Sequence, residues 1–105
     1  MQKIEAVVDA VDDREDVYPV VLKKGERVEV TLRHARGKLR LYLWRPGTTT
    51  VATAGGNGAR NVLRYDDGRG TKSVRVRAPR SGRYFVNVYA RSGVTNYTLT
   101  VERSS

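Results

Sequence analysis

The residues with the clearest potential for chemistry are carboxylates in a short acidic segment near the start of the chain. The segment is Asp9-Ala10-Val11-Asp12-Asp13-Arg14-Glu15-Asp16. Calcium is a hard cation that takes about six to eight oxygen ligands, so clustered carboxylates and carbonyls in a loop suit it. The spacing does not match an EF-hand, which also requires a glycine and a terminal glutamate. Two interpretations follow: a calcium site, or an acidic turn that offsets nearby arginines.

Nucleophilic and zinc chemistry have little support in this sequence. There is one histidine, His34, and there is no cysteine. A Ser-His-Asp triad needs its histidine held by a carboxylate against a serine, and no serine here lies in a nucleophile-elbow pattern. A single histidine without cysteine cannot supply the nitrogen and sulfur ligands of a typical zinc site. We therefore expect His34 to be a solvated turn residue and the chain not to be an enzyme.

Aromatic residues on the polar side of two predicted strands form a second candidate site. If Leu39, Leu41 and Leu43 point into a core, then Tyr42 and Trp44 point outward, and the same alternation turns Phe85 and Tyr89 outward. If the two strands are neighbours, these four rings form one apolar patch. The arginines that would border this patch are Arg40, Arg45 and Arg91. Exposed aromatic and arginine clusters are typical of binding surfaces, but the same rings could instead cover one another or be buried by loops.

The elements that must position these residues are β-strands, because apolar and polar residues alternate with a period of two. Turn signals such as Lys24-Gly25-Glu26 and Pro79-Arg80-Ser81-Gly82 separate the alternating segments. The predicted strands cover residues 3–8, 17–22, 27–32, 38–44, 61–65, 73–78, 84–91 and 97–102. This pattern predicts an all-β fold, a β-sandwich of two antiparallel sheets with seven or eight strands.

Length and charge set the limits for function. With 105 residues, we expect one domain over residues 1–105, and no apolar run approaches the length of about 18 to 20 residues that a membrane span needs. The net charge is +9, yet the first sixteen residues hold six acids against two bases. The rest of the chain is therefore strongly basic, and an excess of this size attracts polyanions without specifying one. The start Met1-Gln2-Lys3-Ile4 shows no apolar signal-peptide core.

The order of several short motifs carries a family resemblance. The motifs are Asp13-Arg14-Glu15-Asp16-Val17-Tyr18, Lys24-Gly25-Glu26-Arg27-Val28-Glu29-Val30, Leu39-Arg40-Leu41-Tyr42-Leu43, Ser81-Gly82-Arg83-Tyr84-Phe85-Val86-Asn87-Val88-Tyr89 and Asn96-Tyr97-Thr98-Leu99-Thr100-Val101. In this order they resemble the bacterial pre-peptidase C-terminal domain family, from about residue 9 to residue 102. The resemblance implies a jelly-roll-like β-sandwich that accompanies secreted bacterial proteases and other exported enzymes and is itself non-catalytic.

The resemblance also implies candidate calcium ligands. Collagen-binding members of the family bind calcium through an acidic segment before the first core strand and through the carboxylates that lead into the Asp-x-Tyr motif. Carried over by position, these are Asp12 or Asp13 together with Asp16, and Asp9 from the preceding segment. One departure is that Lys38 and Arg40 stand where many members carry an acidic residue around the Leu-x-Leu-Tyr strand. Any role of that carboxylate is absent here.

Our leading hypothesis is a non-catalytic accessory module of a secreted bacterial hydrolase, with calcium as its candidate cofactor. Its partner would be a macromolecular polymer or the protein substrate of a parent enzyme, bound through Tyr42, Trp44, Phe85, Tyr89, Arg40 and Arg91. One alternative is a structural or maturation domain that packs on its parent catalytic domain without an external ligand. Another is a basic module that binds polyanions; nucleic acid as the partner is disfavoured, because only the charge suggests it.

Overall fold

All described secondary structure is antiparallel β-structure. The computed structural model describes residues 2–9, 15–34, 38–47, 62–68 and 70–104. Its strands are β1 (Gln2–Asp9), β2 (Glu15–Leu22), β3 (Arg27–His34), β4 (Lys38–Trp44), β5 (Val62–Asp66), β6 (Lys72–Arg77), β7 (Gly82–Ser92) and β8 (Val94–Ser104). Each predicted strand is present, with bounds that differ by at most three residues at either end. The described residues contain no helix that could span a membrane.

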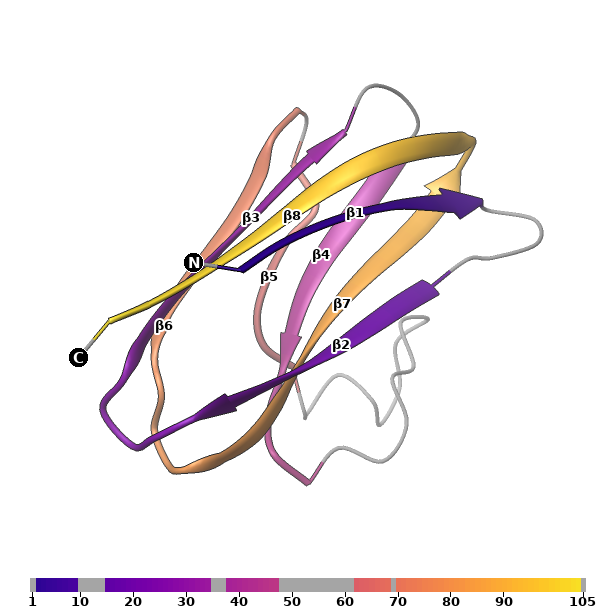
Figure 1. Cartoon of the computed structure of the whole chain (residues 1–105). Coiled ribbons are helices and arrows are strands. Elements are labelled where there is room, and N and C mark those ends of the chain that lie inside the picture. Colours follow the sequence, from indigo (N-terminus) through magenta and orange to yellow (C-terminus); the bar gives the residue numbers. More distant parts are fainter. Residues whose placement is uncertain (1, 10–14, 35–37, 48–61, 69, 105) are drawn as a thin grey trace.

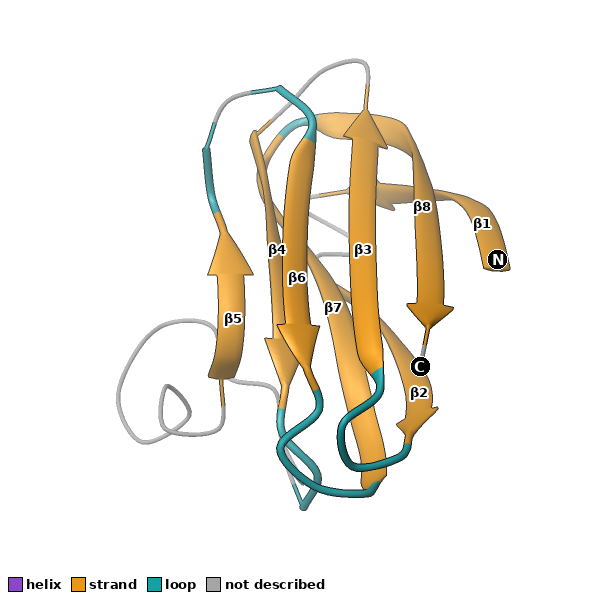
Figure 2. Cartoon of the chain, turned by 90° about the vertical axis from the view of Figure 1, so that its left-hand side faces the viewer, coloured by secondary structure: helices purple, strands orange, loops and turns teal. Residues whose placement is uncertain are grey.

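The strands form two four-stranded sheets that pack face to face. One sheet has the order β1-β8-β3-β6 and the other the order β2-β7-β4-β5 (Figure 1). Successive strands therefore alternate between the sheets over most of the chain, which is the winding of a jelly roll. Figure 2 shows β6, β3, β8 and β1 side by side, with the β2–β3 and β6–β7 turns at the same end of the molecule. The prediction of an all-β sandwich is confirmed.

The core lies between the sheets and is built from alternate residues of each strand. Leu39, Leu41 and Leu43 of β4 face it, as their period of two predicts. The remaining buried members of the core cluster are Val20, Leu22, Val28, Val30, Leu32, Val74, Ala78, Tyr84, Val86, Val88, Ala90, Tyr97, Leu99 and Val101. Burial of apolar surface contributes roughly 25 cal/mol per Å², so this interior supplies the main driving force for folding.

The turns at one end of the sandwich are tied together by backbone hydrogen bonds. Gly25 N donates to Ala78 O at 2.8 Å, and Ala78 N donates to Glu26 O at 2.8 Å, which joins the β2–β3 turn to the end of β6. Tyr84 then donates its hydroxyl to Arg80 O at 2.7 Å, within the β6–β7 turn. These bonds explain why loops that are distant in sequence form one surface.

Gly82 at the start of β7 has a packing reason to be glycine. A Cβ at this position would lie 2.9 Å from both Cβ and Cγ of Pro46. In the Gly-x-Tyr motif of residues 82–84, the glycine therefore lets the backbone pack closely against Pro46. The tyrosine of the motif donates the hydrogen bond to Arg80 O in the preceding turn.

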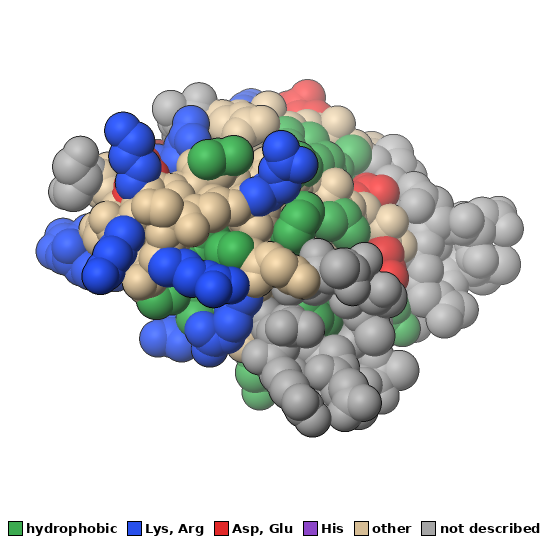
Figure 3. Space-filling view, turned by 90° about the horizontal axis from the view of Figure 1, so that it is seen from below, with side chains coloured by type: hydrophobic (Ala, Val, Ile, Leu, Met, Phe, Trp, Pro, Cys, Tyr) green, Lys and Arg blue, Asp and Glu red, His purple; other side chains and the backbone are tan. Residues whose placement is uncertain are grey.

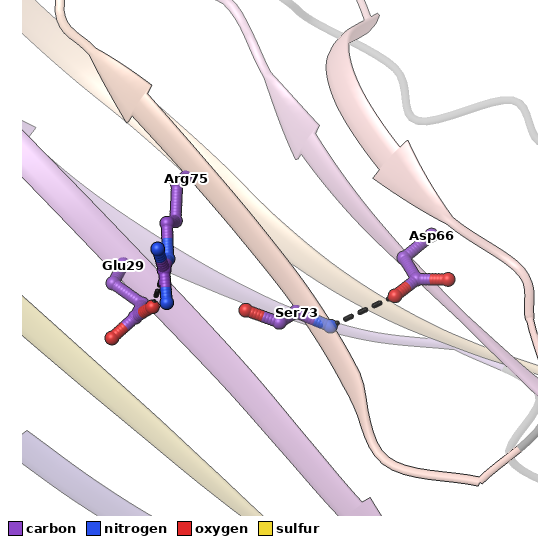
Figure 4. Close-up of polar contacts among 4 residues, drawn as sticks. All are labelled: Glu29, Asp66, Ser73 and Arg75. Atoms are coloured by element: carbon purple, nitrogen blue, oxygen red, sulfur yellow. Dashed lines mark hydrogen bonds and ion pairs between the residues drawn. The ribbon is translucent and has the colours of Figure 1, made fainter.

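Polar contacts fix two of the four edge strands, β5 and β6, which follow one another in the chain. Asp66 accepts hydrogen bonds from Ser73 N and from Gly68 N, each at 2.9 Å, and so closes the β5–β6 connection. Glu29 of β3 forms an ion pair with Arg75 of β6 on the outer face of the first sheet (Figure 4).

Candidate functional site

The predicted aromatic patch is one layer on the outer face of the second sheet. Because β4 pairs with β7, Arg40 lies opposite Tyr89 and Trp44 lies opposite Phe85. The condition that the two strands are neighbours is therefore met. The prediction that these residues form an exposed patch is wrong for Trp44, which is 0 % exposed, and for Tyr42, which is 8 % exposed. Phe85, Tyr89 and Arg40 are half-buried, and the Arg91 side chain lies outside the described residues.

Contacts within the layer explain part of this burial. The ring of Tyr42 lies 6.0 Å from that of Trp44 and 6.1 Å from that of Tyr65, the latter in a stacked arrangement. Tyr65 belongs to β5, which pairs with β4, so β4 has a neighbour on both sides. Among the described residues of this layer, Tyr65 is the large ring that stays accessible, with 61 % of its surface exposed.

A buried amide connects the aromatic layer to the adjacent strand β2. Trp44 Nε1 donates to Asn87 Oδ1 at 3.3 Å, and Asn87 Nδ2 donates to the main-chain oxygen of Asp16 at 3.1 Å. Asn87 is 0 % exposed, so both hydrogen bonds satisfy polar groups that would otherwise be costly to bury. Trp44 thus has a structural role, because its indole holds the position of β2 through Asn87.

Two buried polar atoms flank Tyr89 on the same face. In the register of the sheet, Glu15 lies opposite Tyr89 on one side and Arg40 lies opposite it on the other. Glu15 Oε1 and Arg40 Nε are buried and have no hydrogen-bond partner in the described structure. Arg40 Nη1 does donate to the Tyr42 hydroxyl, at 3.3 Å. Arg40 was predicted to border the aromatic patch, but its side chain instead contacts a ring within the aromatic layer.

Among the predicted calcium ligands, the structure describes the side chain of Asp16, which takes part in a cluster with two tyrosines. Tyr97 donates its hydroxyl to Asp16 Oδ2 at 2.5 Å, and the hydroxyls of Tyr97 and Tyr18 lie 2.5 Å apart. Burial, together with the hydrogen bonds to Asp16 and Tyr18, raises the pKa of Tyr97 far above its usual 10.0. This cluster bridges the sheets, because Tyr97 belongs to β8 and its two partners belong to β2.

The described residues alone do not fit a calcium ion. They contain no group of three or more histidine, cysteine, aspartate or glutamate side chains that could hold a metal ion. Glu15 and Asp16 are adjacent on β2 and therefore point to opposite faces of the sheet. Asp12, Asp13 and the side chain of Asp9 lie outside the described residues. The calcium site stays a prediction.

Sequence reasoning missed the residues that join these clusters. Asn87 occupies a polar position in the alternation of β7, and nothing in that pattern marks it as buried. Lys72 was detectable, because it is in phase with the core residue Val74 at the start of β6. Lys72 is 2 % exposed, and its Nζ lies 3.0 Å from His34 Nε2 and donates to Gly70 O at 3.0 Å.

His34 is accordingly not the solvated turn residue that we expected. It is half-buried, ends β3 and contacts Lys72. Burial lowers the pKa of the Lys72 ammonium, while Asp66 and Asp67 act in the opposite direction. This pair closes one end of the sandwich.

A shallow groove of about 640 Å³ crosses the outer face of the first sheet near His34. It is lined by residues of β1, β3 and β8, namely Glu5, Ala6, Arg33, His34, Asn96, Tyr97 and Thr98. The groove is open, and its lining includes one carboxylate, one guanidinium and one imidazole.

The topology and the site contents define a class: a jelly-roll β-sandwich with aromatic and polar clusters that hold its sheets together. Residues 14–90 match the bacterial pre-peptidase C-terminal domain family, and the chain belongs to this family. The family resemblance seen in the sequence is thus confirmed. No curated protein matches the chain.

Solved structures with the same fold include a domain of a collagenase and two lysozyme inhibitors. The pre-peptidase C-terminal domain of collagenase from Bacillus anthracis has a TM-score of 0.71 and 16 % identity, covering 96 % of this chain and 88 % of its own. PliG of Aeromonas hydrophila, a periplasmic inhibitor of g-type lysozyme, has a TM-score of 0.70 and 19 % identity, covering 98 % and 85 %. PliG of Salmonella Typhimurium has a TM-score of 0.58 and 18 % identity, covering 97 % and 89 %. At these identities the likeness shows the fold.

Proposed function

We propose that this chain is a non-catalytic binding module, exported from the bacterial cell, that positions an enzyme on a macromolecular partner. The observation that carries the proposal is the family match over residues 14–90, since this family is one of accessory domains. The structural likeness to a domain of a collagenase is consistent with it. So is the chemistry of the described residues, whose polar clusters are engaged in hydrogen bonds between strands.

Tyr42 and Trp44 of the predicted aromatic face are not contact residues in this proposal, because both are buried. Trp44 is fully buried and therefore offers no surface to a partner in this conformation. Replacing Trp44 would therefore reduce stability and would not report on binding. Exposed residues at the ends of the sandwich are better candidates for contact.

A sedimentation experiment tests the proposal. The chain is fused to a fluorescent protein and mixed with insoluble collagen, with bacterial peptidoglycan and with a cross-linked acidic polysaccharide. We expect the fusion to pellet with at least one of these polymers and to release no soluble fragments from any of them. Pelleting equal to that of the fluorescent protein alone would overturn the proposal and favour a domain that only packs on its parent enzyme. Release of fragments would overturn its non-catalytic character.

A second candidate function is the binding of an enzyme by a free-standing module. The specific observation is that PliG of Aeromonas hydrophila, named as a lysozyme inhibitor, shares the fold over 98 % of this chain. Inhibition of g-type lysozyme is measured directly as the rate at which it clears a suspension of bacterial cell walls. Inhibition at stoichiometric concentrations would favour this function. An unchanged rate would exclude lysozyme of this type as the partner.

A further inference from the structure

The cations of the described chain gather at one end of the sandwich. This surface, called the basic end below, is formed by the β2–β3 turn, the end of β4, the β6–β7 turn and the end of β8. Its exposed cations are Lys23, Lys24, Arg27, Arg45, Arg77, Arg80, Arg83 and Arg103. The described acids at this end are Glu26, Glu29 and Glu102. Figure 3 shows the basic side chains over one half of the molecule and acidic ones toward the other half.

Three of these arginines are held in place by main-chain oxygens. Arg77 donates to Gly25 O at 3.1 Å and Arg80 donates to Pro46 O at 2.9 Å. Arg103 donates to Val21 O at 3.2 Å, across the gap between the sheets. Each guanidinium has five N–H donors in a fixed fork, so such a bond orients the group and leaves donors for an anion. Binding an anion then costs less side-chain entropy than it would for a disordered arginine.

Like charges face each other on neighbouring strands at this end. Arg27 of β3 lies directly opposite Arg77 of β6 in the ladder. Directly opposed like charges destabilise a sheet, whereas two residues further along the same pair of strands Glu29 neutralises Arg75. An anion between Arg27 and Arg77 would remove this repulsion.

Two grooves at the basic end meet at one arginine. The first, of about 440 Å³, runs between the ends of β3, β6 and β8. Its charged lining is Arg27, Glu29, Arg75, Arg77, Glu102 and Arg103. The second, of about 790 Å³, follows the β2–β3 turn and is lined by Val21, Lys23, Lys24, Gly25, Glu26 and Arg103. Since Arg103 lines both, the cations form a continuous track from Lys23 to Arg77.

We propose that this track binds an acidic polysaccharide, whose carboxylate or sulfate groups pair with the arginines and lysines of the two grooves. A linear chain can follow connected grooves, whereas a flat lipid surface cannot enter them. Val21 is 59 % exposed in the second groove and offers an apolar contact for the face of a sugar ring. Single-stranded nucleic acid binds on exposed aromatic rings, and neither groove has an aromatic residue in its lining. The inference rests on the proposed function as a binding module and names its partner.

The test measures binding of the whole chain to heparin, as a sulfated probe, and to polygalacturonate, as a carboxylated probe. The main variant is Lys23→Gln/Lys24→Gln/Arg27→Gln, because the structure gives these three side chains no hydrogen bond or ion pair with a described residue. We expect it to fold like the wild type and to bind about 10- to 100-fold more weakly, from about two- to fivefold per cation. The dependence of Kd on salt should also become shallower, because fewer counterions are released.

The matched control is Arg33→Gln/Lys38→Gln/Arg64→Gln, which removes the same charge from exposed positions away from both grooves. It should retain at least a third of the wild-type affinity. Equal losses in the two variants would overturn the proposal, because they would show attraction by net charge alone. Tighter binding to vesicles of phosphatidylglycerol or to oligothymidylate than to both polysaccharides would also overturn it. Retention on collagen or peptidoglycan that the main variant does not alter would refute this inference and leave the proposed function intact.

Discussion

The hydrogen bonds of Tyr97 should contribute a large share of the stability of the sandwich. Tyr97 is 3 % exposed, and its hydroxyl contacts the Asp16 carboxylate and the Tyr18 hydroxyl, each at 2.5 Å. The substitution Tyr97→Phe keeps the ring in the core and removes only the hydroxyl. Because Tyr97 and Asp16 come from different sheets, the change tests a link between the sheets rather than the core itself.

The size of the effect follows from the charge of the acceptor. A hydrogen bond to an ionised group contributes about 1.5 to 3 kcal/mol, and the substitution also leaves the half-buried Asp16 without one of its donors. We therefore expect Tyr97→Phe to lower the free energy of unfolding by about 2 to 3 kcal/mol. A domain of this size has a total of about 5 to 15 kcal/mol. The corresponding fall in Tm is about 10 °C or more.

Urea unfolding at neutral pH, followed by circular dichroism, measures this difference. A double-mutant cycle with Asp16→Asn isolates the pair, and we expect a coupling energy of about 1 to 2 kcal/mol. Tyr65→Phe is the control, because Tyr65 is 61 % exposed and a surface change of this kind costs under about 0.5 kcal/mol. A Tyr97→Phe protein as stable as the Tyr65→Phe protein, or an additive cycle, would refute the reasoning.

Three further predictions concern alkaline pH, calcium and packing. The raised pKa of Tyr97 implies that the stabilising effect of its hydroxyl is complete below pH 10 and declines at about 1.4 kcal/mol per pH unit above it. As the pH rises above 10, the urea midpoint should therefore fall less steeply for Tyr97→Phe than for the wild type. Parallel curves of urea midpoint against pH would contradict this prediction. If the acidic segment binds calcium, the Tm of the wild type is higher in millimolar calcium than in EDTA, and the substitutions Asp13→Asn/Asp16→Asn abolish this difference. A wild-type Tm that is equal in calcium and in EDTA would reject the site. Gly82→Ala forces a Cβ against Pro46 and should cost about 1 to 3 kcal/mol in urea unfolding, so a neutral result would mean that this turn can relax.

The strands and their inner faces were predictable because alternation is a local property. Leu39, Leu41 and Leu43 show which side of β4 faces the core without any knowledge of its neighbours. What covers the other side is a tertiary property, so the exposure predicted for Trp44 was wrong.

The clusters that hold the sheets together show the same limit. The sequence placed Asp16 and Tyr18 in one motif and Tyr97 in another, 79 residues from Tyr18. Their contact depends on β2 and β8 meeting at one end of two different sheets, which no spacing within either motif encodes. The motifs therefore identified the family correctly, while the reason for these residue types became visible only in the fold.

The charge distribution follows from topology in the same way. Residues 23–27, 77–83 and 103 are far apart in the sequence, where they appear as a diffuse basic excess. In a jelly roll with this strand order, the β2–β3 turn, the β6–β7 turn and the end of β8 come to one end of the sandwich. The end of β1 and the start of β2 lie at the opposite end (Figure 1). The cations of these turns thus gather on one surface, and a polyanion would be drawn to that end of the protein.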